Sequence, residues 1–178
     1  QQGRTVMLLG GLGTTDATRF GGTQYAKVIL KTLWGLPPAL DMDYEKRVQS
    51  AIRDIVNQGH AESAHDISDG GLAVALAECA YNGIGASIEI APESATGLRP
   101  AFALFHEGPS RILLSTAAPE QVEQIARKYH VEALRIGVTM NARLRIGDGS
   151  AAWIDSPVDR LKQVWENALA EQLAPVHV

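Results

Sequence analysis

The sequence predicts an α+β fold, in which a mixed β-sheet is covered by helices. Strand-like and helix-like stretches both occur, but they do not alternate regularly along the chain. Regular alternation is typical of a doubly wound parallel sheet, which this pattern therefore disfavours. The chain has no internal repeat, heptad run or low-complexity segment. Its 178 residues, of which 46% are hydrophobic, are enough for one domain over residues 1–178 with a sizeable core.

The first part of the chain contains a predicted strand and two glycine-rich turns. Thr5 to Leu9 is an apolar run typical of a buried strand. The following Gly10–Gly13 turn is no dinucleotide fingerprint, because Asp16 stands where the third glycine is needed, so we interpret it as a flexible turn. Gly21 and Gly22 are better candidates, because a helix is predicted from there to about Leu33. Its N-terminus could bind a nucleotide phosphate or simply be capped.

The centre of the chain, Ser63 to Glu78, is predicted to be a short strand, a polar turn and the start of a helix. An amphipathic helix precedes it, which Asp41 or Asp43 can cap and which ends at Gly59. The helix that follows has apolar residues at helical spacing, namely Leu72, Ala75, Leu76, Cys79 and Ala80.

The polar turn carries residues suited to binding a magnesium nucleotide. A strand-to-helix turn presents unpaired backbone N–H groups, which attract phosphates. Gly70 and Gly71 allow a ligand to come close, and Asp66 and Asp69 are hard oxygen donors for Mg²⁺. The alternative is structural: Ser68 or Asp69 caps the helix and His65 bonds to the backbone. An EF-hand is excluded, because Ala77 stands at its closing position.

The second half of the chain supplies the remaining strands and helices. After an exposed loop over 91–99, Pro100 is predicted to open a short helix. Glu107 and Arg111 are expected to form an ion pair, with a functional turn as the alternative. Strands are predicted over 86–90, 111–115, 134–138, 143–146 and 151–154, and a helix from Pro119. The last helix is predicted to bury Val158, Leu161, Trp165, Ala168 and Leu169, and the chain after Leu173 to fray.

Composition and charge exclude several classes of function. Sixteen Lys and Arg residues against 20 Asp and Glu residues give a net charge of −4, which argues against a nucleic-acid surface. No stretch is apolar enough to span a membrane, and we expect no signal peptide. The single cysteine, Cys79, is expected to be a buried thiol, and a reducing cytoplasmic location fits.

The motif from His65 to Glu78 resembles the signature of phosphoribosylformylglycinamidine synthase (FGAM synthase), in the C-terminal domain of the second repeat. Three flanking segments resemble the same family in the same order: Phe20–Tyr25, Pro37–Asp41 and Leu104–Arg111. His106 and Gly108 depart from the family pattern in the last of them. The resemblance implies the fold of the C-terminal domain of the aminoimidazole ribonucleotide synthetase superfamily.

The resemblance also implies a function in purine biosynthesis. FGAM synthases are ligases that convert formylglycinamide ribonucleotide, ATP and glutamine into formylglycinamidine ribonucleotide. By resemblance, Asp66 would bind Mg²⁺, Ser68 would contact the ATP or ADP nucleotide, and Asp69, Gly70 and Gly71 would shape the turn. The catalytic histidine of the family lies elsewhere, so no catalytic residue is assigned.

Two alternatives remain open: a non-catalytic, nucleotide-stabilised scaffold, or a sibling synthetase of the superfamily. The chain opens with Gln1 and no methionine, and we expect it to be the C-terminal fragment of a longer synthase, inactive in isolation. Its expected partners are the remaining synthase domains, a glutaminase and small accessory subunits.

Overall fold

The computed structural model describes residues 1–173 and confirms the α+β class. One seven-stranded sheet has the order β2-β4-β1-β5-β3-β6-β7. The β3–β6 pair is parallel, and the other neighbouring pairs are antiparallel. The strands are β1 (Thr5–Leu9), β2 (Ser63–Asp66), β3 (Ile84–Glu89), β4 (Ile112–Thr116), β5 (Ala133–Asn141), β6 (Arg143–Gly147) and β7 (Ala152–Pro157).

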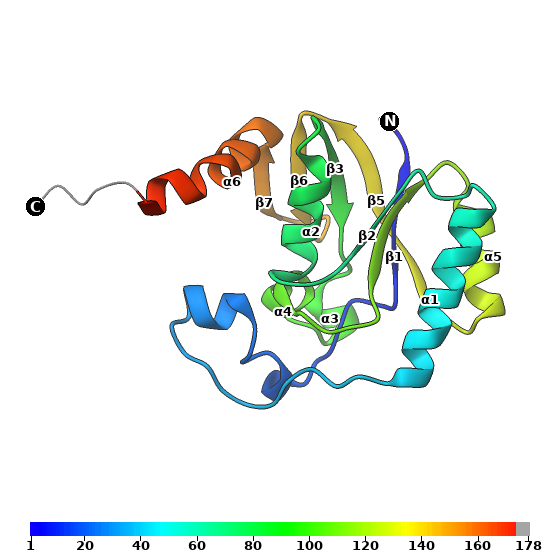
Figure 1. The fold of residues 1–178 in the computed structure, drawn as a ribbon, viewed down its shortest axis with the longest axis horizontal. Helices are drawn as coiled ribbons and strands as arrows, with labels where there is room; N and C mark the ends of the chain where they lie inside the picture. The colour runs from blue at the N-terminus through cyan, green and yellow to red at the C-terminus, as the bar shows by residue number, and fades with distance from the viewer. Residues whose placement is uncertain (174–178) are drawn as a thin grey trace, which may run out of the picture.

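Helices cover both faces of this sheet. Two helices, α1 and α5, lie side by side on one face, and α2 and α4 lie against the other (Figure 1). Asp41 caps α1, as predicted, by accepting hydrogen bonds from the amides of Asp43 and Tyr44. No helix within residues 1–173 is long and apolar enough to cross a membrane. The helices are α1 (Met42–Asn57), α2 (Gly71–Ala80), α3 (Glu93–Thr96), α4 (Pro100–Phe105), α5 (Pro119–Lys128) and α6 (Val158–Leu173).

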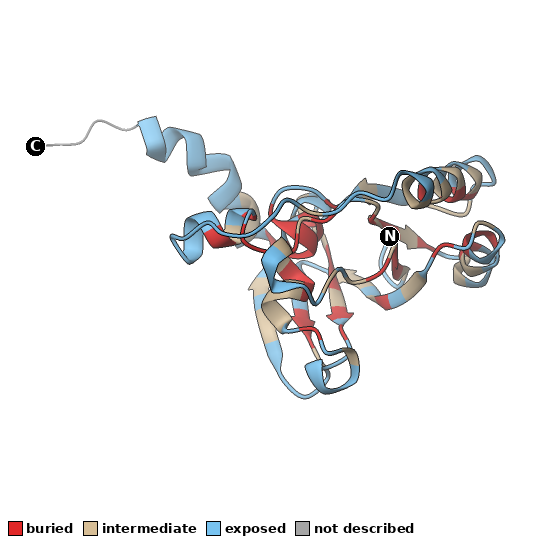
Figure 2. Cartoon of the chain, turned by 90° about the horizontal axis from the view of Figure 1, so that it is seen from below, coloured by how far each residue is buried: buried red, intermediate tan, exposed pale blue. Residues whose placement is uncertain are grey.

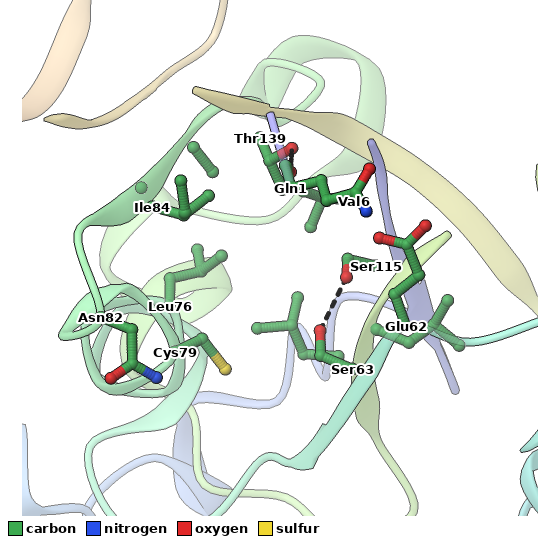
Figure 3. A pocket seen from close by; sticks show the side chains of 14 residues that line it. Gln1, Val6, Glu62, Ser63, Leu76, Cys79, Asn82, Ile84, Ser115 and Thr139 are labelled. Atoms are coloured by element: carbon green, nitrogen blue, oxygen red, sulfur yellow. Dashed lines mark hydrogen bonds between the residues drawn. The ribbon is translucent and has the colours of Figure 1, made fainter. Parts of the chain in front are cut away.

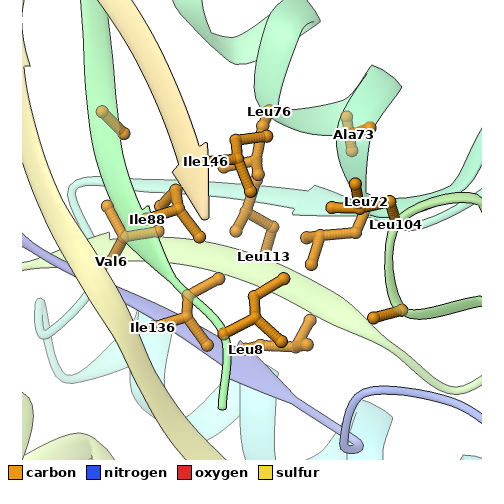
Figure 4. Packing of buried hydrophobic residues seen from close by; sticks show 14 of the residues in the cluster. Val6, Leu8, Leu72, Ala73, Leu76, Ile88, Leu104, Leu113, Ile136 and Ile146 are labelled. Atoms are coloured by element: carbon orange, nitrogen blue, oxygen red, sulfur yellow. The ribbon is translucent and has the colours of Figure 1, made fainter. Parts of the chain in front are cut away.

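Strand β1 separates two hydrophobic cores. Successive side chains of a strand point to opposite faces of its sheet. Val6 and Leu8 therefore pack with α2 in one core (Figure 4), whereas Met7 and Leu9 pack with α1 and α5 in the other. The side chains of Met7, Leu8 and Leu9 are completely buried. The strand is apolar at every one of these positions because both of its faces are covered.

The prediction that α6 buries a whole apolar face is wrong. Val158 is its one buried residue, while Trp165 is 59% exposed and Leu169 is 70% exposed. The helix leaves the sheet after β7 and runs outward (Figure 1), and Figure 2 shows its outer part exposed. Trp165 instead lies beside Tyr81, with ring centroids 5.3 Å apart. Residues 174–178 lie outside the described part of the chain, so the expected fraying after Leu173 stays a prediction.

The predicted helix from Gly21 to about Leu33 is also wrong. A 3₁₀ turn forms at Ala17–Arg19, and the helical part is a single π-turn over Tyr25–Ile29. The segment then folds back, because the Trp34 amide donates to the carbonyl of Gly21 and the Leu36 amide to that of Thr18. These contacts stop the helix and leave several apolar side chains exposed, namely Val28, Ile29, Leu30 and Leu33. A smaller departure is the short helix α3 within the expected loop 91–99.

Truncation of the central strand is expected to destabilise the protein strongly. Leu8→Ala should lower the free energy of unfolding by about 2–5 kcal/mol, because it opens a cavity beside fully buried neighbours. The matched variant Leu33→Ala, whose leucine is 62% exposed, should change it by less than about 0.5 kcal/mol. Urea denaturation measures both. Equal effects would contradict the placement of β1 between the two cores.

Candidate functional site

The turn between β2 and α2 requires glycine at both of its last positions. Gly70 and Gly71 adopt φ angles of 81° and 68°, which favour glycine. A Cβ on Gly71 would lie 2.7 Å from the carbonyl oxygen of Leu104 in α4. Gly70 is the N-cap of α2, and neither Ser68 nor Asp69 forms a side-chain cap hydrogen bond to the helix. The structural alternative, in which Ser68 or Asp69 caps α2, is therefore wrong.

Glu107 takes the place of a local cap. Its Oε1 atom accepts hydrogen bonds from the backbone amides of Gly70 and Gln24, each at 2.8 Å. One carboxylate oxygen therefore ties the central turn to the segment that follows Gly21 and Gly22. Hydrogen bonds from backbone N–H groups to a carboxylate are charge-assisted and stronger than neutral ones.

The predicted ion pair between Glu107 and Arg111 does not form. The Arg111 guanidinium donates instead to the backbone carbonyls of Leu12, His106 and Gly108. Arg111 is buried, 3% exposed, and turned toward these carbonyls, while Glu107 is engaged by the two amides. The spacing of the two charges in the sequence gave no sign that each would bond to backbone groups.

Three of the predicted nucleotide-binding residues meet in one open cavity. Gly22, Ser68 and Asp69 line it together with Thr23 and Glu107. A Cβ on Gly22 would meet no atom within 4 Å, so its backbone is open to a ligand. Gly21, Gly70, Gly71 and Asp66 do not line this cavity. A Cβ on Gly21 would lie 2.1 Å from the carbonyl oxygen of Trp34, so this glycine allows close packing.

Asp66 lies at the end of β2 and lines a different depression, together with Glu45, Arg53 and Arg111. Its side chain is 79% exposed. Within residues 1–173, no three His, Cys, Asp or Glu side chains are close enough together to hold a metal ion. Mg²⁺ commonly binds one or two carboxylates and takes its other ligands from water and phosphate oxygens. The described residues therefore form no all-protein cage, and a magnesium ion at Asp66 would need further oxygen ligands from a nucleotide or from water.

His65 connects the strand and the helix of the motif. Its Nδ1 atom lies 2.6 Å from the backbone oxygen of Asp66, and its Nε2 atom lies 3.5 Å from a carboxylate oxygen of Glu78 in α2. The predicted bond of His65 to the backbone is therefore confirmed. Both ring nitrogens have partners, which favours a structural role for this side chain.

A buried histidine and a buried arginine lie beside Glu107. The sequence predicts an ion pair or a functional turn for Arg111, and it marks His106 only as a departure from the family pattern. Burial, with the Arg111 charge adding, lowers the pKa of His106 to about 4, so its imidazole is neutral at pH 7. The Nδ1 atom of His106 accepts a hydrogen bond from the Gly108 amide at 3.1 Å. Burial also lowers the pKa of Arg111 to about 10, which leaves it charged at pH 7.

Cys79 is exposed, so the prediction of a buried thiol is wrong. It lines a cavity of about 260 Å³ (Figure 3). Cys79 is near the C-terminal end of α2, whereas the polar turn precedes the N-terminal end. Leu76 and Ala80, rather than Cys79, point into the packed core. Partial burial of the thiol raises its pKa, and the negative charge of Glu78 adds to this effect.

Known proteins resemble this chain over most of its length. The sequence profile described as "AIR synthase related protein, C-terminal domain" matches residues 1–148. The phosphoribosylformylglycinamidine synthase subunit PurL of Synechococcus sp. (strain CC9902) is 37% identical over 98% of this chain and 23% of its own length. PurL of Synechococcus sp. (strain JA-2-3B'a(2-13)) is 44% identical over 77% of this chain and 17% of its own length. The chain thus spans about a fifth of these curated relatives.

Solved structures with the same fold come from Thermotoga maritima. PurL complexed with ADP has a TM-score of 0.70 at 20% identity, and covers 91% of this chain and 26% of that chain. PurL complexed with FGAR has a TM-score of 0.68 at 21% identity, and the match covers 91% of this chain and 28% of that chain. The structure of PurLQS has a TM-score of 0.69 at 21% identity, and the match covers 91% of this chain and 26% of that chain. These likenesses confirm the fold that the motif implied.

Removal of the Glu107 carboxylate is expected to loosen the polar turn. Glu107→Ala should lower the free energy of unfolding by about 1–3 kcal/mol, because two backbone amides lose their acceptor. Amide hydrogen exchange at Gly70 and Gln24 should accelerate. The control Glu166→Ala removes an exposed glutamate from α6 and should change neither quantity, since exposed ion pairs contribute little. Unchanged exchange at Gly70 in Glu107→Ala would contradict this role.

The buried neutral imidazole of His106 is expected to make the protein less stable in acid. The unfolded state binds a proton at the ordinary pKa of 6.5 and the folded state at about 4. The contribution to stability is therefore complete above pH 6.5 and is lost as the pH falls to 4, by roughly 2–3 kcal/mol. Urea denaturation across this window measures the loss. His106→Asn should flatten it, and an unchanged slope would refute the assignment.

Proposed function

Since this chain belongs to the family of AIR synthase related proteins, as their C-terminal domain, we propose that it is the C-terminal domain of an ATP-dependent FGAM synthase. The reaction joins nitrogen from glutamine to formylglycinamide ribonucleotide in purine biosynthesis, and ATP activates the formamide oxygen. The observation that carries the proposal is the cavity in which Gly22, Ser68 and Asp69 meet beside the glycine turn. The identity to PurL subunits over most of the chain supports it.

We call the cavity lined by Gly22, Ser68 and Asp69 the nucleotide corner. Its residues would bind the nucleotide phosphates. The N-terminus of α2 presents its positive dipole end near Ser68 and Asp69, and the open backbone at Gly22 allows a phosphate to approach. Asp69 and Glu107 place negative charge in the same cavity. Phosphates would be repelled there unless a cation screens them. Asp66 would hold Mg²⁺ at the edge of this corner, and the ion would supply that screening.

The chain would contribute binding and orientation, and no catalytic residue is assigned to it. His65 is not placed to act as a general base, because its ring nitrogens contact the Asp66 carbonyl and Glu78. Phosphoryl transfer depends mainly on positioning and charge stabilisation, so a domain without a nucleophile can still be essential to it.

A second candidate function is a nucleotide-stabilised scaffold within the same synthase. The observation that favours it is that Glu107 already serves the turn by binding two amides, and that the described residues offer no cluster of three metal ligands. In this case the nucleotide would stabilise the domain without taking part in turnover.

The proposal extends to partners and location. The chain spans about a fifth of its curated relatives, which supports the view that residues 1–178 form one domain of a longer synthase and are inactive alone. The other synthase domains, a glutaminase and small accessory subunits would be its partners. The PurLQS structure of the Thermotoga maritima relative is consistent with such an assembly. We place the enzyme in the cytoplasm, where purine precursors are made.

The proposal is tested with Asp66→Asn in the full-length protein. FGAM formation is measured with formylglycinamide ribonucleotide, ammonia, ATP and Mg²⁺, and thermal unfolding is measured beside it. If the corner serves turnover, activity should fall by about 100-fold or more with little change in Tm, because a metal ligand is lost. The control Asp159→Asn, at the start of α6, should keep full activity.

Two other outcomes would decide against this reading. A lower Tm of Asp66→Asn with its turnover retained would favour the scaffold. A full-length wild-type protein that forms no FGAM would overturn the proposed reaction itself.

A further inference from the structure

A second cavity of about 350 Å³ lies next to the proposed nucleotide corner. Pro38 and Pro109 line both cavities, so the two are neighbours. The walls of the second come from the glycine turn after β1, which holds Gly10 and Gly13, and from the segment between α4 and β4. The side chains that supply charge or hydrogen bonds to its lining are Thr14, Asp16, Arg19, His106 and Arg111. None of these side chains is used by the function proposed above.

Arg111 brings a buried positive charge to this cavity. It is 3% exposed and forms no ion pair with a carboxylate in the described residues. Its Nε, Nη1 and Nη2 atoms donate to three backbone carbonyls, of Gly108, Leu12 and His106 respectively. A guanidinium has five N–H groups, so two make no hydrogen bond within residues 1–173. Burial of an unpaired charge is costly unless something compensates it.

His106 adds a second unused donor. It is 5% exposed, and its neutral Nδ1 atom accepts a hydrogen bond from the Gly108 amide. A neutral imidazole that accepts at one nitrogen carries its proton on the other. The proton therefore lies on Nε2, and this buried nitrogen has no hydrogen-bond partner. Unpartnered buried polar groups are rare in native proteins and call for an explanation.

The remaining charges of the lining balance each other. Arg19 lies 3.6 Å from the carboxylate of Asp16, and Asp16 also accepts from the amide and hydroxyl of Thr18. The Arg19 side chain is 30% exposed at the edge of the cavity. With Asp16 and Arg19 paired, the charge of Arg111 leaves the lining of the cavity net positive. This environment suits an anion and disfavours a cation.

We propose that this cavity binds the oxyanion group of a small molecule, with Arg111 as its buried positive charge, His106 in its wall and Arg19 at its entrance. A phosphoryl group and a carboxylate share the required chemistry, namely several acceptor oxygens and a negative charge. The site is separate from the nucleotide corner and needs neither ATP nor Mg²⁺. The inference therefore stands whether or not the proposed function is correct.

The test is titration of the 178-residue chain with inorganic phosphate and, in a parallel arm, with acetate. Binding is followed by the ¹⁵N NMR shift of the His106 ring and by calorimetry, without nucleotide or magnesium. Phosphate should shift the ring nitrogen resonances of His106, because this side chain lines the cavity. Arg19→Gln should weaken phosphate binding about ten-fold, because the entrance charge is lost and Asp16 is left unpaired. Tighter binding of phosphate than of acetate would assign a phosphoryl group, and the reverse a carboxylate.

The control Arg145→Gln makes the same change of charge on an exposed residue of β6, outside this cavity, and should leave binding unchanged. His106→Asn provides a second variant, which should weaken binding while the folded state is verified by its NMR spectrum. The proposal is overturned if the folded chain binds neither anion at about 10 mM, or if Arg19→Gln and Arg145→Gln bind equally well.

Discussion

The candidate site depends on one carboxylate oxygen that two backbone amides share. Through Oε1 of Glu107, the segment around Gln24, the turn at Gly70 and the chain after α4 meet at one point. These three segments are far apart in the sequence, and no other described side chain caps α2. The cavity lined by Gly22, Ser68 and Asp69 exists because this contact holds its two walls together. The position of any bound phosphate would follow from it.

The sheet explains why these segments can meet. Strand β2 pairs with β4, and Asp66 lies opposite Ile112, so the turn after β2 and the turn before β4 are at the same edge. The first turn carries the proposed nucleotide corner, and the second carries Glu107, His106 and Arg111. Two adjacent cavities thus lie at the same end of the sheet. One is lined by acidic side chains and favours a cation, and the other is positively charged and favours an anion.

Local patterns predicted the parts of this fold that local chemistry determines. The α+β class, the Asp41 cap and the strand–turn–helix motif could be read from periodicity and from capping residues. The larger failures depend on contacts between separate segments of the chain. The back-folding of Trp34 onto Gly21 ends a helix that apolar spacing favoured. Trp165 is exposed because its helix extends past the sheet. Glu107 binds two backbone amides and does not pair with Arg111. The residue pattern of one segment does not predict which residues of another segment it will contact.

The central position of β1 has a consequence for how the chain is made. Both of its neighbours, β4 and β5, are formed by residues 112–141, so β1 leaves the ribosome long before either partner exists. Met7, Leu8 and Leu9 are fully buried in the folded domain. Until β4 and β5 have been made, their strand has no neighbour with which to pair. Non-local pairing of this kind slows folding and exposes apolar strands to aggregation. A nascent chain of this domain therefore exposes an apolar segment until residues 112–141 have been made.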